Sequence, residues 1–160
     1  MKSLREILAA AALLFTVVTA ATSYSTLSQR IPTHFNAAGV ADGWGDKSSL
    51  WMLVAVACFL YVVLTLVRFL PSSLINVPVA QEQRAAAIPI SLEMIEWVKA
   101  ETICMFAFIV WTAVAVVQGR SLGLGAWFLP VTLLAIFGTI AFYLTRIMRL
   151  KNVDGQEKRG

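Results

Sequence analysis

Four long apolar runs separate the polar parts of this chain. A helix that spans a membrane needs about 20 mainly apolar residues to cross about 30 Å of hydrocarbon. The runs that come close to this length cover approximately residues 4–27, 50–70, 102–118 and 127–147. The pattern therefore predicts an all-α membrane protein built as a bundle of four transmembrane helices.

The first run also has features of a secretory signal. It follows a basic start with Lys2 and Arg5, and the small residues at 19–21 form a tolerable cleavage site. The apolar stretch continues beyond that point, which favours an uncleaved membrane helix. Cleavage remains the alternative.

Composition supports a membrane location. The 160 residues are 59% hydrophobic and 14% charged, whereas soluble domains have about 45–50% apolar and about 25% charged residues. A chain this short exposes much of its side-chain surface, so that surface must face lipid. We expect one domain over residues 1–150 and a flexible polar tail over 151–160. Cys58 and Cys104 lie inside apolar runs and are expected to be free thiols.

The distribution of Lys and Arg predicts the orientation. Four spans place ten of the 13 basic residues on the side of the termini and only Arg30, Lys47 and Arg120 on the other side. Because cytoplasmic loops carry the excess of basic residues, both termini are expected in the cytoplasm. The basic residues form no stripe with interleaved aromatics, so a nucleic-acid partner is not expected.

The connection between the second and third runs is predicted to be irregular from Pro71 to Pro89, because it contains three prolines. Ser91 is then expected to be the N-cap of an amphipathic approach to the third helix, with Glu96 paired to Lys99 three residues on. No run carries an ionisable residue in its middle third. This pattern argues against a pump, channel or coupled transporter.

The most distinctive segment is the glycine-rich extracytoplasmic loop 31–48 between the first two runs. It holds the only histidine, His34, together with Asn36 and Asp42. Glycines at this density permit tight turns, so a compact loop is expected. Two interpretations of this loop are open. Its polar groups hydrogen-bond the loop's own backbone while Phe35 and Trp44 anchor the loop at the lipid headgroups, or the polar groups bind a ligand.

A metal site is a weaker interpretation of the same loop. His34, Asp42 and Asp46 are ligand types of a zinc or mixed oxygen/nitrogen site. No second histidine accompanies them, and the chain has no nucleophile elbow and no phosphate-binding loop. We therefore expect no catalytic residues and no cofactor, and we keep a metal-dependent enzyme at the membrane surface as an alternative.

The loop resembles the signature of the DUF1648 family, the domain found at the start of SdpI-like bacterial membrane proteins. The resemblance rests on Ile-Pro-Thr-His-Phe-Asn-Ala-Ala-Gly at 31–39, on Asp-Gly-Trp-Gly at 42–45, and on Lys47. Pro71, residues 75–78 and the Trp97, Lys99 and Glu101 set look like later features of the same family. It implies a multi-pass protein of the bacterial inner membrane. The best-understood relatives protect the cell from a secreted peptide toxin and hold a transcriptional repressor at the membrane.

The loop predicts a binding protein, and the family resemblance implies a role in immunity or signalling. We expect it to contact the lipid bilayer, an extracellular peptide or envelope ligand, and a protein partner or a second copy of itself. The candidate binding residues are Pro32, His34, Phe35, Asn36, Gly39, Asp42, Trp44 and Lys47. An accessory subunit of a larger membrane complex is the other alternative.

Overall fold

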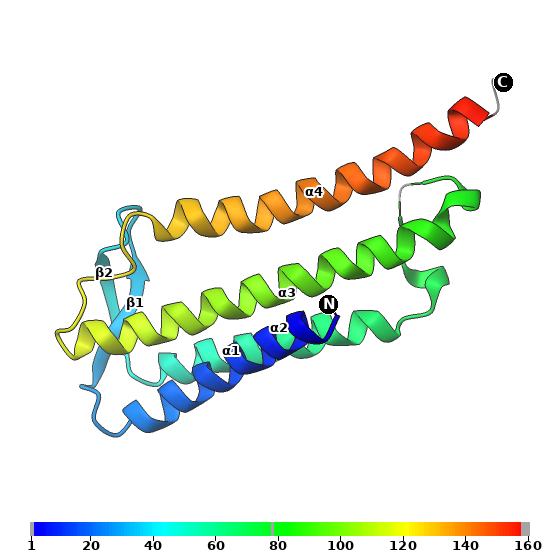
Figure 1. The fold of residues 1–160 in the computed structure, drawn as a ribbon. Coiled ribbons are helices and arrows are strands. Elements are labelled where there is room, and N and C mark those ends of the chain that lie inside the picture. Colours follow the sequence, from blue (N-terminus) through cyan, green and yellow to red (C-terminus); the bar gives the residue numbers. More distant parts are fainter. Residues whose placement is uncertain (1, 78, 158–160) are drawn as a thin grey trace.

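Residues 2–77 and 79–157 are described by the computed structural model, and within these ranges the chain is mostly helical (Figure 1). Four of its helices are long and apolar enough to cross a membrane. They are α1 (Lys2–Ser23), α2 (Ser49–Leu66), α3 (Gln81–Val117) and α4 (Phe128–Glu157). The prediction of four helices with the length and apolar composition of membrane spans is thus confirmed.

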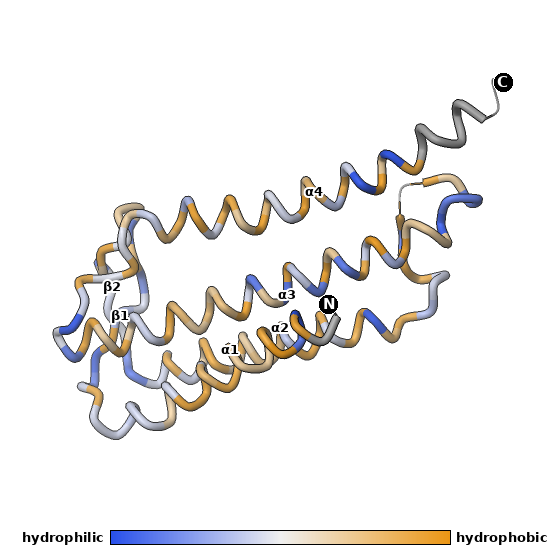
Figure 2. The backbone as a smooth tube through the Cα atoms, in the orientation of Figure 1, coloured by the Kyte–Doolittle hydropathy of each residue, from blue (hydrophilic) through white to orange (hydrophobic). Residues whose placement is uncertain are grey.

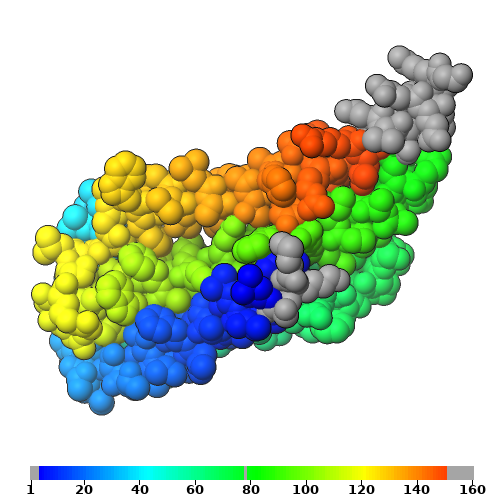
Figure 3. Space-filling view, viewed as in Figure 1, coloured from blue at the N-terminus to red at the C-terminus, as the bar shows by residue number. Residues whose placement is uncertain are grey.

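Helix α3 is the centre of the bundle. It packs against α1, α2 and α4, whereas α1 and α2 make a smaller contact with each other. Figures 1 and 3 show α4 on one side of α3 and α1 with α2 on the other. Figure 2 shows that apolar residues dominate the helices. Since α4 is packed mainly on α3, most of its surface is left for lipid.

Small residues allow the helices to approach closely. Ala9 and Ala20 of α1 and Ala100 of α3 are fully buried, and Ala107 and Ala113 are nearly so. Association of helices in a membrane depends on such close packing, because lipid tails are as apolar as the helix side chains.

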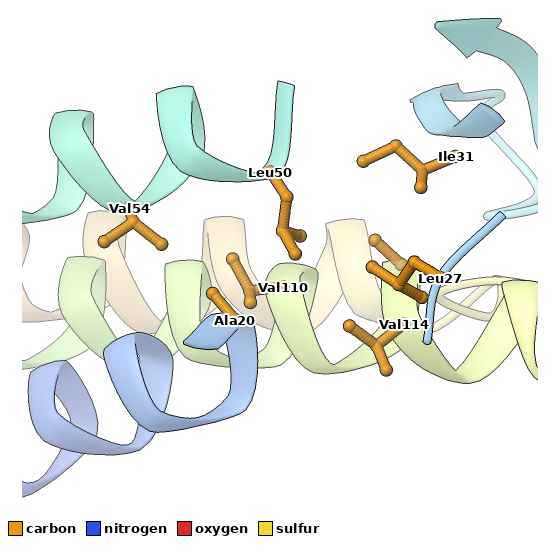
Figure 4. Packing of buried hydrophobic residues seen from close by; sticks show 8 residues of the cluster. Ala20, Leu27, Ile31, Leu50, Val54, Val110 and Val114 are labelled. Atoms are coloured by element: carbon orange, nitrogen blue, oxygen red, sulfur yellow. The ribbon is translucent and has the colours of Figure 1, made fainter. Parts of the chain in front are cut away.

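The main apolar core lies at one end of the bundle. Ala20 comes from α1 and Leu27 from the segment after it, Leu50 and Val54 come from α2, and Val110 comes from α3. Figure 4 shows these side chains together with Ile31 of the loop that follows α1. The core therefore fixes that loop to the ends of three helices.

The predicted extracytoplasmic loop contains a two-stranded antiparallel sheet, which corrects the all-α prediction. Strand β1 (Arg30–Phe35) pairs with β2 (Ala41–Asp46), and Pro32 stands opposite Trp44. Irregularities in pairing on both sides of His34 show where the strands bulge. Glycines at 43 and 45 had suggested turns, but in the hairpin they face bulky neighbours: an added Cβ would overlap the side chains of His34 and Thr33.

Helix α3 begins earlier than predicted. The connection after α2 contains two short 3-10 turns, Val67–Phe69 and Ser72–Leu74, but Gln81–Pro89 is helical rather than irregular. Residues 81–87 are glutamines, glutamate, arginine and alanines, and their high helix propensity outweighs the neighbouring prolines. Pro89 sits inside the helix, where it removes one backbone hydrogen bond.

Two local predictions for this segment are therefore wrong. Ser91 is not an N-cap: it is buried inside α3, and its hydroxyl donates to the carbonyl of Ala87 at 3.1 Å. The expected pair of Glu96 with Lys99 is replaced by contacts to α1, where Arg5 binds Glu96 and Lys99 binds Glu6. Tertiary contacts across the bundle replace the local pair on the helix.

At the end of the bundle remote from the hairpin, α4 packs on the start of α3. Ile147, Ala87 and Val77 form a second buried apolar cluster there. Helix α4 continues to Glu157, into the segment predicted as a tail, and residues 158–160 lie outside the described residues. The flexibility of that segment stays a prediction.

Candidate functional site

Asn36 organises the tip of the hairpin. Its side-chain oxygen accepts hydrogen bonds from the backbone N–H groups of Ala38 at 3.0 Å and Val40 at 3.1 Å. Its own backbone N–H donates to the Val40 carbonyl at 2.9 Å. The asparagine thus makes the bonds of an Asx-type turn, and its amide oxygen is used by the turn itself.

The hairpin tip is attached to the connection between α3 and α4. The Leu124 N–H donates to the Gly39 carbonyl at 2.7 Å, and Val40 forms an isolated bridge with Gly123. Gly39 has a φ of 73°, and a Cβ there would overlap the backbone of Gly125. Only glycine at position 39 satisfies both the backbone conformation and this close approach.

His34 and Asp42 face each other across the two strands. His34 Nδ1 lies 2.5 Å from the Asp42 carboxylate, and both side chains are exposed. An exposed pair of this kind contributes little to stability, about 0–1 kcal/mol. The pair therefore orients the imidazole more than it holds the hairpin together.

The remaining candidates lie toward the base of the hairpin. Trp44 is 44% exposed, and its backbone carbonyl accepts from the Arg30 guanidinium at 3.1 Å. The Lys47 ammonium lies 4.9 Å from the centroid of the Tyr24 ring. Asp46 accepts from the Ser48 N–H at 2.8 Å, and this bond holds the pKa of the Asp46 carboxyl below its usual value.

A cavity of about 420 Å³ lies beneath the hairpin. Its walls come from β1 and the turn, from the starts of α2 and α4, from Ile109 of α3, and from the connection between α3 and α4. Most of the lining side chains are apolar, while Thr33, His34, Asn36 and Ser49 are polar. Clefts of 300–1,000 Å³ with a mainly apolar lining and a few polar groups are typical of small-ligand sites.

The cavity gathers part of the predicted set. Pro32, His34, Phe35, Asn36 and Gly39 line it. By contrast, Asp42 reaches it only through its bond to His34, and Trp44 and Lys47 are not part of its wall.

The three weak metal candidates are not brought together as a set. His34 and Asp42 are adjacent, whereas Asp46 bonds the backbone at the turn before α2. Within residues 2–77 and 79–157, no group of three or more His, Cys, Asp or Glu side chains is arranged to hold a metal ion.

Sequence analysis missed the helical half of the cavity wall. Met52 and Leu53 of α2, Ile109 of α3, and Phe128 and Leu129 of α4 line it. Their apolar character gave no signal, because lipid-facing and cavity-facing side chains look alike in sequence. Their position next to the hairpin follows only from the packing of the helix ends.

Sequence analysis also missed a set of charged side chains at the opposite end of the bundle, here called the ionic cluster. Lys99 is 1% exposed and donates to Glu6 at 2.6 Å and to Thr65 at 3.1 Å, while Tyr61 donates to Glu6 at 2.5 Å. Arg5, only 2% exposed, lies against Trp97. The cluster comprises Arg5, Glu6, Arg68, Glu93, Glu96, Lys99 and Arg146.

A signal for the ionic cluster was present in the sequence. Arg5 and Glu6 open the first apolar run, and three glutamates and Lys99 fall within residues 93–101 just before the third. With α3 beginning at Gln81, the charges at 93–101 lie inside one continuous helix and precede its apolar run 102–118, which carries no charged residue. Their partners could not be assigned without the packing of α1 on α3. Glu101, the last of them, accepts from Thr139 of α4 at 2.5 Å.

The fold defines a multi-pass membrane protein whose helices carry a hairpin and a cavity at one end. Residues 11–58 match the model of the family described as "Domain of unknown function (DUF1648)", which confirms the family resemblance over this segment. The matched segment covers the second half of α1, the hairpin and the first half of α2. No curated protein and no solved structure matches the chain.

Proposed function

We propose that the protein binds the apolar part of an amphipathic ligand, such as the side chains of an extracellular peptide, in the cavity beneath the hairpin. The observation that carries this proposal is the composition of the wall, which joins polar hairpin residues to apolar helix residues. An apolar side chain entering the cavity leaves water, while His34 stays exposed at the hairpin to meet a polar group of the ligand.

Binding is favoured over catalysis by the uses of the polar groups. The Asn36 oxygen serves the turn, and His34 is oriented by Asp42 beside a mainly apolar cavity. The family match falls on the segment that builds the hairpin and half of the wall. Together with the charge distribution, the resemblance supports a bacterial inner-membrane protein that uses this site for immunity or signalling.

The test fills the cavity without changing its polar groups. Leu129 of α4 lines the cavity, whereas Leu134 on the same helix is 74% exposed and lies outside that wall. The variants Leu129→Trp and Leu134→Trp therefore make the same chemical change inside and outside the site. Wild type and both variants are purified from native membranes in mild detergent, and bound peptides and lipids are identified by mass spectrometry.

The expected result is a companion retained by wild type and Leu134→Trp and lost from Leu129→Trp. A recovered peptide is then synthesised and titrated against the three purified proteins. Equal binding to all three, with unchanged thermal unfolding, would show that the cavity is not the binding site. If the same proteins co-purify with wild type and with both variants, an accessory-subunit role is favoured instead.

A further inference from the structure

A second cavity lies at the end of the bundle remote from the hairpin. Its volume is about 730 Å³, and Arg5, Arg68 and Arg146 line it together with Glu93 and Glu96. The three arginines come from α1, from the 3-10 turn that follows α2, and from α4. Side chains that are far apart in sequence thus line one cavity beside the ionic cluster.

This cavity lies near the ends of three of the four candidate membrane spans. Arg5 is one residue from the end of the first span, and Arg68 is one residue from the end of the second. Arg146 lies about one helical turn before the end of the last span at Leu150. In a bilayer this level is the headgroup region, where lipid phosphates lie.

The ion pairs of the cluster leave an excess of positive charge. Among the side chains that the structure describes in these pairs, four are cationic and three are carboxylates, so the cluster as a whole carries one positive charge more than negative. A phosphodiester carries one negative charge. One such group in the cavity would make the cluster electrically neutral.

Arg68 is the cation with the weakest bond to a carboxylate. The two oxygens of Glu6 are already bonded by Tyr61 at 2.5 Å and Lys99 at 2.6 Å, while Arg68 is 4.0 Å away. The Arg68 side chain is 46% exposed. A guanidinium has five N–H donors, so this one can bind an anion that enters from the membrane side.

Arg146 is placed in a similar way. It shares Glu93 with Arg5: Arg5 binds one carboxylate oxygen at 2.8 Å and Arg146 the other at 3.2 Å. The Arg146 side chain is 42% exposed, whereas that of Arg5 is 3% exposed. The buried Arg5 therefore neutralises the carboxylates of the cavity wall, whereas the exposed Arg68 and Arg146 have N–H donors at the mouth of the cavity.

We propose that this cavity binds the phosphodiester of an anionic phospholipid headgroup through Arg68 and Arg146. A lipid is favoured over a soluble phosphate compound because the wall is partly apolar. Phe69 is 69% exposed and lines the cavity with Leu92. These side chains suit the glycerol and acyl portions that accompany a lipid phosphate. Basic pockets between transmembrane helices are a known form of headgroup site.

The test uses two double variants with the same change of charge. Arg68→Gln/Arg146→Gln removes the proposed donors, and Arg30→Gln/Arg120→Gln removes two arginines at the hairpin end. Wild type and both variants are titrated in detergent with phosphatidylglycerol, phosphatidylcholine and soluble glycerol 3-phosphate, and bound molecules are counted by native mass spectrometry. Circular dichroism and thermal unfolding check that each protein is folded.

We expect wild type and the Arg30/Arg120 variant to bind phosphatidylglycerol more tightly than phosphatidylcholine. Each cationic side chain near an anionic group contributes a factor of roughly five, so the Arg68/Arg146 variant should bind phosphatidylglycerol roughly 30-fold more weakly. If that variant does not fold, Arg68→Gln alone decides the question, with an expected weakening of roughly fivefold.

Equal affinity of all variants for phosphatidylglycerol would overturn the proposal, as would equal affinity of wild type for the two lipids. Arginine-dependent binding of glycerol 3-phosphate as tight as that of phosphatidylglycerol would replace the lipid with a soluble phosphate compound. These outcomes are independent of the ligand at the hairpin end, because the two cavities share no lining residue.

Discussion

The ammonium of Lys99 lies 2.6 Å from the carboxylate of Glu6 and joins the middle of α3 to the start of α1. Lys99 is 1% exposed, while the Glu6 side chain is 32% exposed. Thr65 accepts a further bond from the same ammonium, so the contact also includes α2. This pair and its bond to Thr65 therefore join α1, α2 and α3 through polar contacts.

Replacing Lys99 with methionine should destabilise the bundle. Breaking a buried ion pair on one side costs about 3–5 kcal/mol, because the remaining charge loses its partner. Since Glu6 is partly exposed and also contacts Tyr61, we expect about 2–3 kcal/mol. Thermal or denaturant unfolding in detergent measures the effect.

The double variant Glu6→Gln/Lys99→Met is the control for this effect. It removes both charges and should recover part of the lost stability. A double variant less stable than Lys99→Met would contradict the assignment of Glu6 as the main partner.

Substitution of Gly39 should loosen the hairpin from the helices. Gly39→Ala requires a positive φ at alanine and an overlap with the Gly125 backbone, so we expect a loss of about 1–3 kcal/mol at the hairpin. Hydrogen exchange of residues 30–46 should increase. Gly138→Ala on α4 is the matched control, because nothing lies within 4 Å of an added Cβ there. Faster exchange in both variants would show that hairpin docking is not the cause.

The His34→Ala/Asp42→Asn variant separates binding from folding. The pair is exposed, so its loss should change the free energy of unfolding by no more than about 1 kcal/mol. The proposed ligand should nevertheless be lost, because the oriented imidazole lines the cavity. Unfolding curves and ligand retention are measured on the same sample. Failure of this variant to insert or fold would make the hairpin pair structural.

The turn between β2 and α2 should respond to acid through Asp46. Its folded pKa is lowered from 3.8 by the bond from the Ser48 N–H. This bond therefore stabilises the turn fully above about pH 3.8 and is lost as the pH falls through the lower folded value. Hydrogen exchange at Ser48, corrected for intrinsic rates, should show this loss. Asp46→Asn should remove the dependence, and an unchanged profile in that variant would assign it to another group.

The orientation of the bundle can be tested with single cysteines in a Cys58→Ser/Cys104→Ser background. The excess of basic residues near the termini predicts that a cysteine at Ala38 of the hairpin is labelled from outside intact cells. A cysteine at Ser73, after α2, should be labelled only after the membrane is permeabilised. The reverse pattern would place the hairpin in the cytoplasm.

The helices could be predicted from the sequence more completely than the loop between the first two. The spans were visible because a bilayer demands long apolar runs, whatever the packing. The start of α3 at Gln81 differs from the prediction, since Pro78 and Pro89 indicate an irregular segment while residues 81–87 between them have high helix propensity. The hairpin was predicted only as a compact loop, because its glycines were interpreted as turn residues. In the structure Gly43 and Gly45 lie in the paired strand, and Gly39 makes the close contact to Gly125.

By itself, the sequence determined that this chain crosses a membrane with four helices and carries a distinctive segment between the first two. That information is local, because hydrophobicity along a run and glycines in a short segment need no partner to be recognised. Only the tertiary structure decided that His34 meets Asp42, that hairpin and helix ends enclose a cavity, and that Lys99 binds Glu6 rather than Glu96. These contacts join residues from different elements, and they depend on how helices of similar composition pack against one another.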